Sequence, residues 1–326
     1  MEPLEHVDND QDVLKLLNGS LKHEWAVSLE YLVHAYSMPK GKYFYTDPVV
    51  SAVLDMRAQT IQIGIDEMYH GLQMGLVVRQ MGAVPTFQTD EVIRFPRIVD
   101  NLARDQNTED VVIALYQKSR FREGAFPKVQ NMFLNISYDE VRHSRQFQAM
   151  VEALKKSGQE EASCFVPDPR AEEKEEVRLL QAIVRLENEL MHRYLSHVLL
   201  FSEHQDLSWR LFKNSIDHMR HWDKNSGILI KLGSLIQMEN AERRPDGSER
   251  SLKPMPDVYP GGDRLAALQT LSPAEEKLMA HYQDILRLVP EGEIKEQLKF
   301  QVMQNREHLF TQEWLLKNAR QVKGLV

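Results

Sequence analysis

The sequence has little of what would build a disulfide, a thiolate metal site or a membrane span. Its 326 residues include one cysteine, Cys164, so no intrachain disulfide, thiolate zinc site or iron–sulfur cluster can form. No segment reaches the run of about 18 uncharged apolar residues that a membrane span needs. The N-terminal stretch is acidic, with no apolar run resembling a signal peptide. These absences predict a soluble, cytoplasmic protein.

Positive charge is also in deficit. Lysine and arginine total 40 against 48 aspartate and glutamate, a formal charge of −8. An acidic balance gives no reason to expect nucleic acid or an anionic membrane as a partner. The 42% hydrophobic content is that of an ordinary globular protein. Because one hydrophobic core rarely serves 326 residues, we expect two domains.

Helix breakers are sparse, with 15 glycines and 14 prolines, and this favours helices. Helical periodicity predicts eight of them, at about 10–37, 49–81, 108–123, 127–157, 173–203, 206–238, 273–289 and 291–322. The longest break, 243–262, is rich in proline and glycine. We therefore predict an all-α fold of two tandem four-helix bundles, formed by residues 1–168 and 169–326.

In the first half, charged side chains interrupt the apolar helix stripes that should face the bundle core. The interrupting residues are Glu24, Glu67, His70, Glu109, Glu140 and His143. Several carboxylates in one dry core are costly unless something neutralises them, and no core-facing lysine or arginine is available. Two divalent cations would balance the four carboxylates. Paired Glu-x-x-His motifs, each on one helix face, with a glutamate from each of the two other helices, are typical of di-iron and di-manganese carboxylate bundles.

Three choices around this centre stay open at the level of sequence. Glu109 is the preferred ligand from the third helix, but Asp110 and Glu123 are rivals. Ligating histidines need a partner for their second ring nitrogen. The candidates for supporting roles around the ligands are Tyr31, Asp66 and Asp139. His34 and His197 are expected to be packing histidines rather than ligands.

Three segments resemble the ferritin-like superfamily, and most closely its bacterioferritin and rubrerythrin-type members. KHEWAVSLEYLVHAY, which contains Glu24, is similar to the first-helix motif of bacterioferritin. DEMYHGLQMGLVVRQMGAVP and DEVRHSRQFQAMVEAL are similar to its second and fourth helices. The resemblance covers about residues 10–157. It implies carboxylate ligation by Glu24, Glu67 and Glu140 and imidazole ligation by His70 and His143.

The second half repeats the first with a changed ligand set. Glu187, Tyr194 and His197 repeat the spacing of Glu24, Tyr31 and His34. The equivalent of Glu140 is Asn305 or Arg306, so the full ligand set is not duplicated. The residues of a possible degenerate second site are Glu187, His218, His221, Glu275 and His308. A scaffold with satisfied core histidines is the favoured interpretation of this half, and a mononuclear metal site is the alternative.

The ligand chemistry suits two iron ions, with manganese possible, better than copper or structural zinc. In members of the ferritin-like superfamily that this sequence resembles, reduced di-iron centres react with dioxygen. We therefore expect an O2-dependent oxidase or oxygenase that acts on a small organic substrate and takes electrons from a separate donor. The alternatives are iron handling, such as ferroxidation, storage or peroxide detoxification, and a structural metal-stabilised bundle. We expect a monomer or small homo-oligomer.

Overall fold

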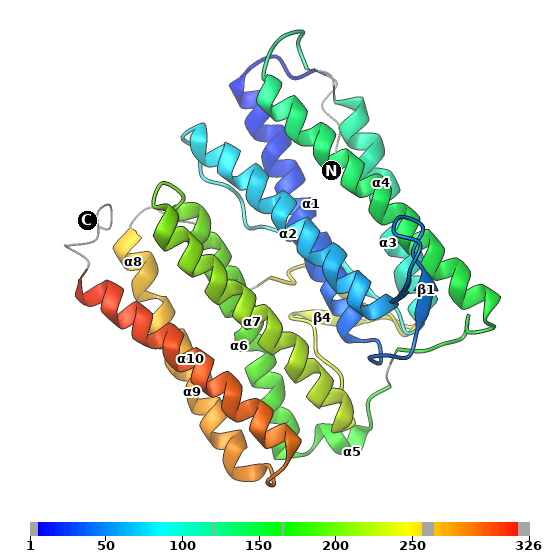
Figure 1. The fold of residues 1–326 in the computed structure, drawn as a ribbon, viewed down its shortest axis with the longest axis vertical. Helices are drawn as coiled ribbons and strands as arrows, with labels where there is room; N and C mark the ends of the chain where they lie inside the picture. The colour runs from blue at the N-terminus through cyan, green and yellow to red at the C-terminus, as the bar shows by residue number, and fades with distance from the viewer. Residues whose placement is uncertain (1–5, 120, 165, 256–263, 319–326) are drawn as a thin grey trace. The chain divides into compact units, whose positions relative to one another are not determined.

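The computed structural model describes residues 6–119, 121–164, 166–255 and 264–318, and most of them are helical. The predicted all-α fold is confirmed (Figure 1). None of the helices in these ranges combines the length and the apolar composition needed to cross a membrane. The chain divides into two compact units, the first formed by Met1–Phe165 with Met238–Pro254, the second by Val166–Gln237 with Met255–Val326.

Four long helices form the first unit. They are α1 (Asp10–Tyr36), α2 (Met56–Gln80), α3 (Ile98–Lys118) and α4 (Pro127–Lys156). α1 packs along α2 and α3 packs along α4, while α1 also contacts α3 and α2 contacts α4 (Figure 1). This arrangement turns one stripe of each helix toward a common core. Its largest fully buried side chains include Trp25, Tyr31 and Phe147.

The second predicted helix begins later than the sequence pattern suggests. Residues 49–55 are not helical; β1 (Phe44–Thr46) and β2 (Val53–Asp55) form an antiparallel hairpin there. The Asp47 carboxylate accepts the backbone N–H groups of Val49 and Val50 at 2.8 and 3.0 Å, which fixes the turn. Asp55 then caps α2 by accepting the N–H of Ala58 at 2.8 Å. Both aspartates act as local hydrogen-bond acceptors, the role in which they compete with helix.

The third helix begins ten residues before its predicted start, at Ile98 rather than at 108. Its buried stripe runs through Ile98, Leu102, Asp105 and Glu109. Asp105 interrupts the apolar helical pattern at a core position, so the pattern does not predict this part of the helix. Asp105 is accommodated because its carboxylate contacts His34 Nδ1 at 2.8 Å.

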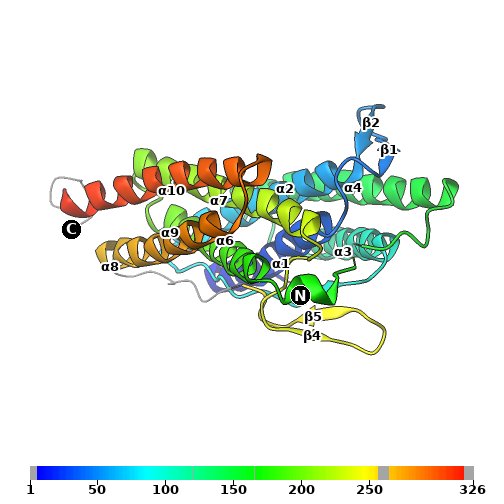
Figure 2. The same ribbon diagram turned by 90° about the horizontal axis from the view of Figure 1, so that it is seen from below.

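A small sheet joins two distant parts of the chain within the first unit. β5 (Glu249–Ser251) pairs antiparallel with β4 (Ala241–Arg243), as Figure 2 shows. β5 also pairs antiparallel with β3 (Val92–Arg94). β3 also packs on α1. The segment Met238–Pro254, which the sequence places in the second domain, is therefore part of the first unit. Of the long break predicted at 243–262, residues 256–262 lie outside the described part.

The second unit is also helical. It contains α6 (Glu175–Leu200), α7 (Gln205–Lys231), α9 (Leu271–Leu288) and α10 (Glu293–Lys317), with the short helices α5 (Pro169–Glu172) and α8 (Arg264–Gln269). α6 packs along α7 and α9, and α10 packs along α9 and contacts α7. The four long helices match the predicted set, but α7 ends at Lys231 rather than at 238. The predicted end of the last helix, at 322, lies outside the described residues. α6 and α7 are joined by residues 201–204, whereas the equivalent connection in the first unit contains the β1–β2 hairpin.

The close approach of α1 and α2 depends on Gly71. A Cβ atom at this position would lie 3.0 Å from two ring carbons of Trp25. That ring is fixed, because its Nε1 donates to Thr86 O at 3.1 Å and it stacks on Phe87 with ring centroids 5.3 Å apart. We expect Gly71→Ala to lower the free energy of unfolding by about 1 to 3 kcal/mol through overpacking. Urea denaturation followed by circular dichroism measures the change.

Gly227 in α7 is the matched control, since a Cβ there would meet nothing within 4 Å. We expect Gly227→Ala to stabilise the protein by about 0.5 to 1 kcal/mol, the usual gain for replacing a helical glycine by alanine. Equal effects of the two substitutions would contradict the packing role of Gly71.

Candidate metal centre

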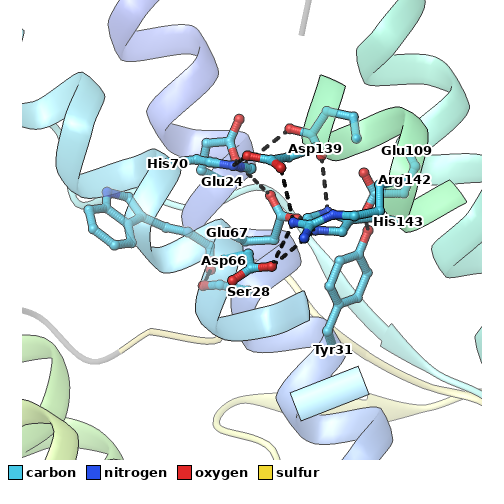
Figure 3. Close-up of polar contacts among 12 residues, drawn as sticks. Glu24, Ser28, Tyr31, Asp66, Glu67, His70, Glu109, Asp139, Arg142 and His143 are labelled. Atoms are coloured by element: carbon cyan, nitrogen blue, oxygen red, sulfur yellow. Dashed lines mark hydrogen bonds and ion pairs between the residues drawn. The ribbon is translucent and has the colours of Figure 1, made fainter. Parts of the chain in front are cut away.

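Six side chains from four helices converge in the core of the first unit (Figure 3). They are Glu24 of α1, Glu67 and His70 of α2, Glu109 of α3, and Glu140 and His143 of α4. Each residue is at most 3% exposed. The i, i+3 spacing within α2 and α4 places each glutamate and histidine on the same helix face, one turn apart. The structure thus brings together all six residues that the sequence singles out.

The six residues form two groups that could each hold a metal ion. Glu24, Glu67, His70 and Glu140 make one group, and Glu67, Glu109, Glu140 and His143 make the other. Within each group the potential ligand atoms all lie within 4.8 Å of one another. Glu67 and Glu140 belong to both groups. Two neighbouring positions therefore share two carboxylates.

Several atoms at the centre of this cluster have no hydrogen-bond partner within the described part of the chain. They are Glu24 Oε2, Glu67 Oε1, both Oε atoms of Glu140, and His143 Nδ1. An unsatisfied buried polar atom costs free energy that a folded core does not normally tolerate. These atoms therefore point to a cation as their missing partner.

The distances within the cluster suit that interpretation. His143 Nδ1 lies 2.8 Å from Glu67 Oε1 and 3.5 Å from Glu140 Oε2. His70 Nδ1 lies 3.0 Å from Glu67 Oε2, 3.4 Å from Glu140 Oε1 and 3.6 Å from Glu24 Oε2. Nitrogen and oxygen ligands bound to one ion at about 2.0–2.2 Å lie about 3 to 3.5 Å from each other. The residues present therefore fit a bound metal.

Without a cation, the buried cluster favours protonation of part of its carboxylates. Burial raises the pKa of Glu24 to about 8, and burial with the charge of Glu140 raises the pKa of Glu109 well above its usual range. Burial opposes ionisation of Glu140 as well, but the neighbouring imidazoles of His143 and His70 lower its pKa. Two imidazoles thus serve four carboxylates, and the raised pKa values of Glu24 and Glu109 favour their protonated form unless a cation takes the place of the protons.

The outer nitrogens of both histidines have carboxylate partners. His70 Nε2 donates to Asp139 at 3.4 Å and His143 Nε2 donates to Asp66 at 3.3 Å. These contacts turn the Nδ1 atoms toward the cluster, the arrangement that orients ligating histidines. Arg142 joins the two aspartates, 3.0 Å from each (Figure 3).

Two tyrosines hold the carboxylates that belong to one group only. Tyr31 donates to Glu109 at 2.6 Å, and Tyr116 donates to Glu24. Of the supporting residues, sequence reasoning named Tyr31, Asp66 and Asp139 but missed Tyr116 and Arg142. Tyr116 lies on the same helical stripe as Glu109, and that spacing is the signal that could have found it. Arg142 lies between the two predicted histidine partners, on a half-exposed surface.

The structure also separates Glu109 from its rivals. Asp110 is exposed, and its carboxylate accepts a hydrogen bond from Ser144 at 2.7 Å. Glu123 is exposed in the loop after α3. Of these three acidic residues, Glu109 alone belongs to the cluster.

A third buried group contains Glu30, His34 and Asp105. Unlike those of the cluster, its side chains are paired with other protein atoms. His34 Nδ1 contacts Asp105 at 2.8 Å, and His34 Nε2 donates to the carbonyl of Ile93 at 2.7 Å. Arg104 pairs with Glu30 at 2.7 Å. Both ring nitrogens are therefore engaged by protein atoms. The contacts agree with the expectation that His34 is a packing residue, and they join α1, α3 and β3.

The second unit brings its own predicted residues together. Glu187, His218 and His221 form one buried group, and His218, Glu275 and His308 form another. His218 belongs to both groups. His197 is not among them; its Nδ1 approaches the carbonyl of Arg193 in its own helix at 2.5 Å.

The chain was compared with known proteins in three ways. A scan of family models, a search of curated proteins and a search of solved structures each found no match to this chain.

Proposed function

We propose that the first unit is a ferritin-like four-helix bundle that holds two divalent metal ions. The observation that carries this proposal is the pair of ligand groups that share Glu67 and Glu140 while carboxylate oxygens at their centre lack partners. These two glutamates would bridge the ions. The other four side chains would complete the two positions, in the pairs Glu24 with His70 and Glu109 with His143.

The donor set favours iron, with manganese as the second choice. Carboxylate oxygens dominate it, and hard oxygen ligands with imidazole suit iron and manganese better than copper. Two divalent ions would also balance the charge of the four buried carboxylates. Asp66 and Asp139 would hold His143 and His70 in orientation, and Tyr31 and Tyr116 would do the same for Glu109 and Glu24.

We propose further that this centre serves an O2-dependent oxidase or oxygenase acting on a small organic substrate. When bound, a pair of reduced irons supplies the electrons with which dioxygen is activated. The chain supplies a water-excluding surrounding for that chemistry. Apolar side chains of the same unit are fully or almost fully buried, among them Trp25, Ile63, Met74, Ile136, Phe147 and Met150. An apolar surrounding suits an organic ligand better than hydrated ions.

Iron handling is the main alternative function, and the position of Arg142 is an argument against it. A ferroxidase needs a path along which cations enter and leave. The acidic residues nearest the outer side of the two histidines are Asp66 and Asp139, and both are paired with the Arg142 guanidinium. The single guanidinium offsets part of the negative charge of the two aspartates and so weakens the attraction of this side for Fe2+. Because the sequence has one cysteine, the electrons would come from a separate donor.

The first test is metal content. Full-length protein is loaded anaerobically with Fe(II), desalted and assayed for iron by plasma emission. We expect Glu67→Ala and His143→Ala to hold about two irons per chain fewer than the wild type, because each removes a ligand of a mutually dependent pair of ions.

Asp110→Asn and Glu123→Gln are the matched controls, since both residues are acidic, close in sequence to the third-helix ligand and outside the cluster. We expect both to keep the iron content of the wild type. Unchanged iron in both ligand variants would refute the ligand assignment.

The second test separates oxygenase from iron handling. An oxygenase keeps its irons bound, whereas a ferroxidase releases Fe(III) and accepts new Fe(II). With a large excess of Fe(II) and O2, we expect about two irons per chain to be oxidised at the centre before the reaction stops. Ferric absorbance and O2 uptake are measured together, with Glu67→Ala as the blank. Sustained oxidation of tens of irons per chain would favour iron handling.

A further inference from the structure

The buried cluster of the second unit keeps the tyrosine contacts of the first. Tyr194 donates to Glu275 at 2.8 Å, as Tyr31 donates to Glu109. The repeat extends to the second tyrosine as well, with Tyr282 donating to Glu187 as Tyr116 donates to Glu24. In both units, then, two carboxylates are fixed in orientation by a phenol from another helix.

The outer partners of the histidines are kept too. His308 Nε2 donates to Asp217 at 3.4 Å, and His221 Nε2 donates to Gln304 at 3.0 Å. Asp217 lies directly before His218, as Asp66 lies directly before Glu67. Both contacts turn an Nδ1 atom toward the cluster, as in the first unit.

The second unit lacks the two carboxylates that both groups of the first unit share. His218 occupies the position equivalent to Glu67. Asn305 is fully buried and donates to Glu187 at 3.5 Å, whereas Arg306 is exposed, so Asn305 takes the place of Glu140. With neither bridging carboxylate, this cluster cannot hold two ions in the manner of the first unit.

His218 is oriented for single-ion binding. Its Nδ1 donates to Glu187 at 2.6 Å, which leaves Nε2 directed at Glu275, 3.1 Å from Oε1. His308 Nδ1 lies 3.5 Å from the same oxygen. Three nitrogen and oxygen atoms bound to one ion at about 2.0–2.2 Å have mutual distances of about 3 to 3.5 Å.

Two atoms of this group have no hydrogen-bond partner among the described residues. They are Glu275 Oε2 and His308 Nδ1. Glu275 is fully buried and His308 is 4% exposed. By contrast, Glu187 has both oxygens engaged, Oε1 by Tyr282 and Oε2 by His218.

His221 Nδ1 and Asn305 Oδ1, beside Glu187, also lack a hydrogen-bond partner within the described part of the chain, but of the oxygens of the two glutamates only Glu275 Oε2 does. The unengaged carboxylate oxygen therefore lies on Glu275, in the group that contains His308.

We propose that the second unit binds a single divalent first-row transition ion through His218 Nε2, the Glu275 carboxylate and His308 Nδ1. Glu187 and Asp217 serve as carboxylate partners of the two ligating imidazoles, the support that ligating histidines usually have. Two imidazoles and one carboxylate form the ligand set of catalytic zinc and of mononuclear non-haem iron sites, both of which keep a coordination position open. The site uses no residue of the first unit's centre.

Zn2+ is the probe, because it does not change oxidation state. Full-length protein and its variants are dialysed against buffered Zn2+, and bound zinc is counted per chain. We expect His308→Gln and Glu275→Gln each to hold one zinc fewer than the wild type. His192→Gln is the matched control, a buried histidine of the same unit whose Nδ1 bonds to the carbonyl of Asn188. It should keep the wild-type count.

Asp217→Asn covers the case in which a ligand variant fails to fold, because it leaves all three ligands in place. We expect it to weaken zinc binding at this site by about 10- to 100-fold, the usual effect of removing the carboxylate partner of a ligating histidine. Each comparison is a difference between chains, so it does not depend on how many ions the first unit holds. The wild-type zinc count in folded His308→Gln and Glu275→Gln, or unchanged affinity in Asp217→Asn, would overturn the proposal.

Discussion

The structure of the first unit depends on the cost of burying carboxylates in a dry helical core. Four glutamates lie within a few ångströms of one another, where solvation by water is lost and like charges repel. Two histidines offset part of this cost, and two tyrosines and two aspartates fix the orientation of the cluster. The helices therefore bring together buried groups of carboxylates and imidazoles that could hold a metal ion.

This constraint is also what made the cluster predictable from sequence. A glutamate on an apolar helix stripe is an exception to the packing pattern, and the four glutamates preferred as ligands on this ground all lie in the cluster. The Glu-x-x-His spacing places two ligands on one helix face without any knowledge of the tertiary structure. Glu109 could be preferred over Asp110 because it continues the stripe of Val112 and Tyr116, and all three are buried.

Other features were beyond sequence reasoning because they depend on contacts between distant segments. The start of α3 was missed because Asp105 occupies a core position, and only its contact with His34 makes that acceptable. The β1–β2 hairpin depends on local hydrogen bonds to Asp47, which compete with a helical pattern. The pairing of β5 with β3 joins residues more than 150 positions apart, a contact that no local pattern specifies.

The two units differ at the centre of their buried clusters but share the contacts around them. The tyrosine and outer-partner contacts recur in the second unit, since each satisfies a buried polar atom that would otherwise be costly. In the first unit, Glu67 and Glu140 belong to both buried groups. The equivalent residues of the second unit are His218 and Asn305, so its groups contain two glutamates rather than four, a charge that two imidazoliums or one divalent ion can offset. The residues at these two positions thus set how much acidic charge each core has to neutralise.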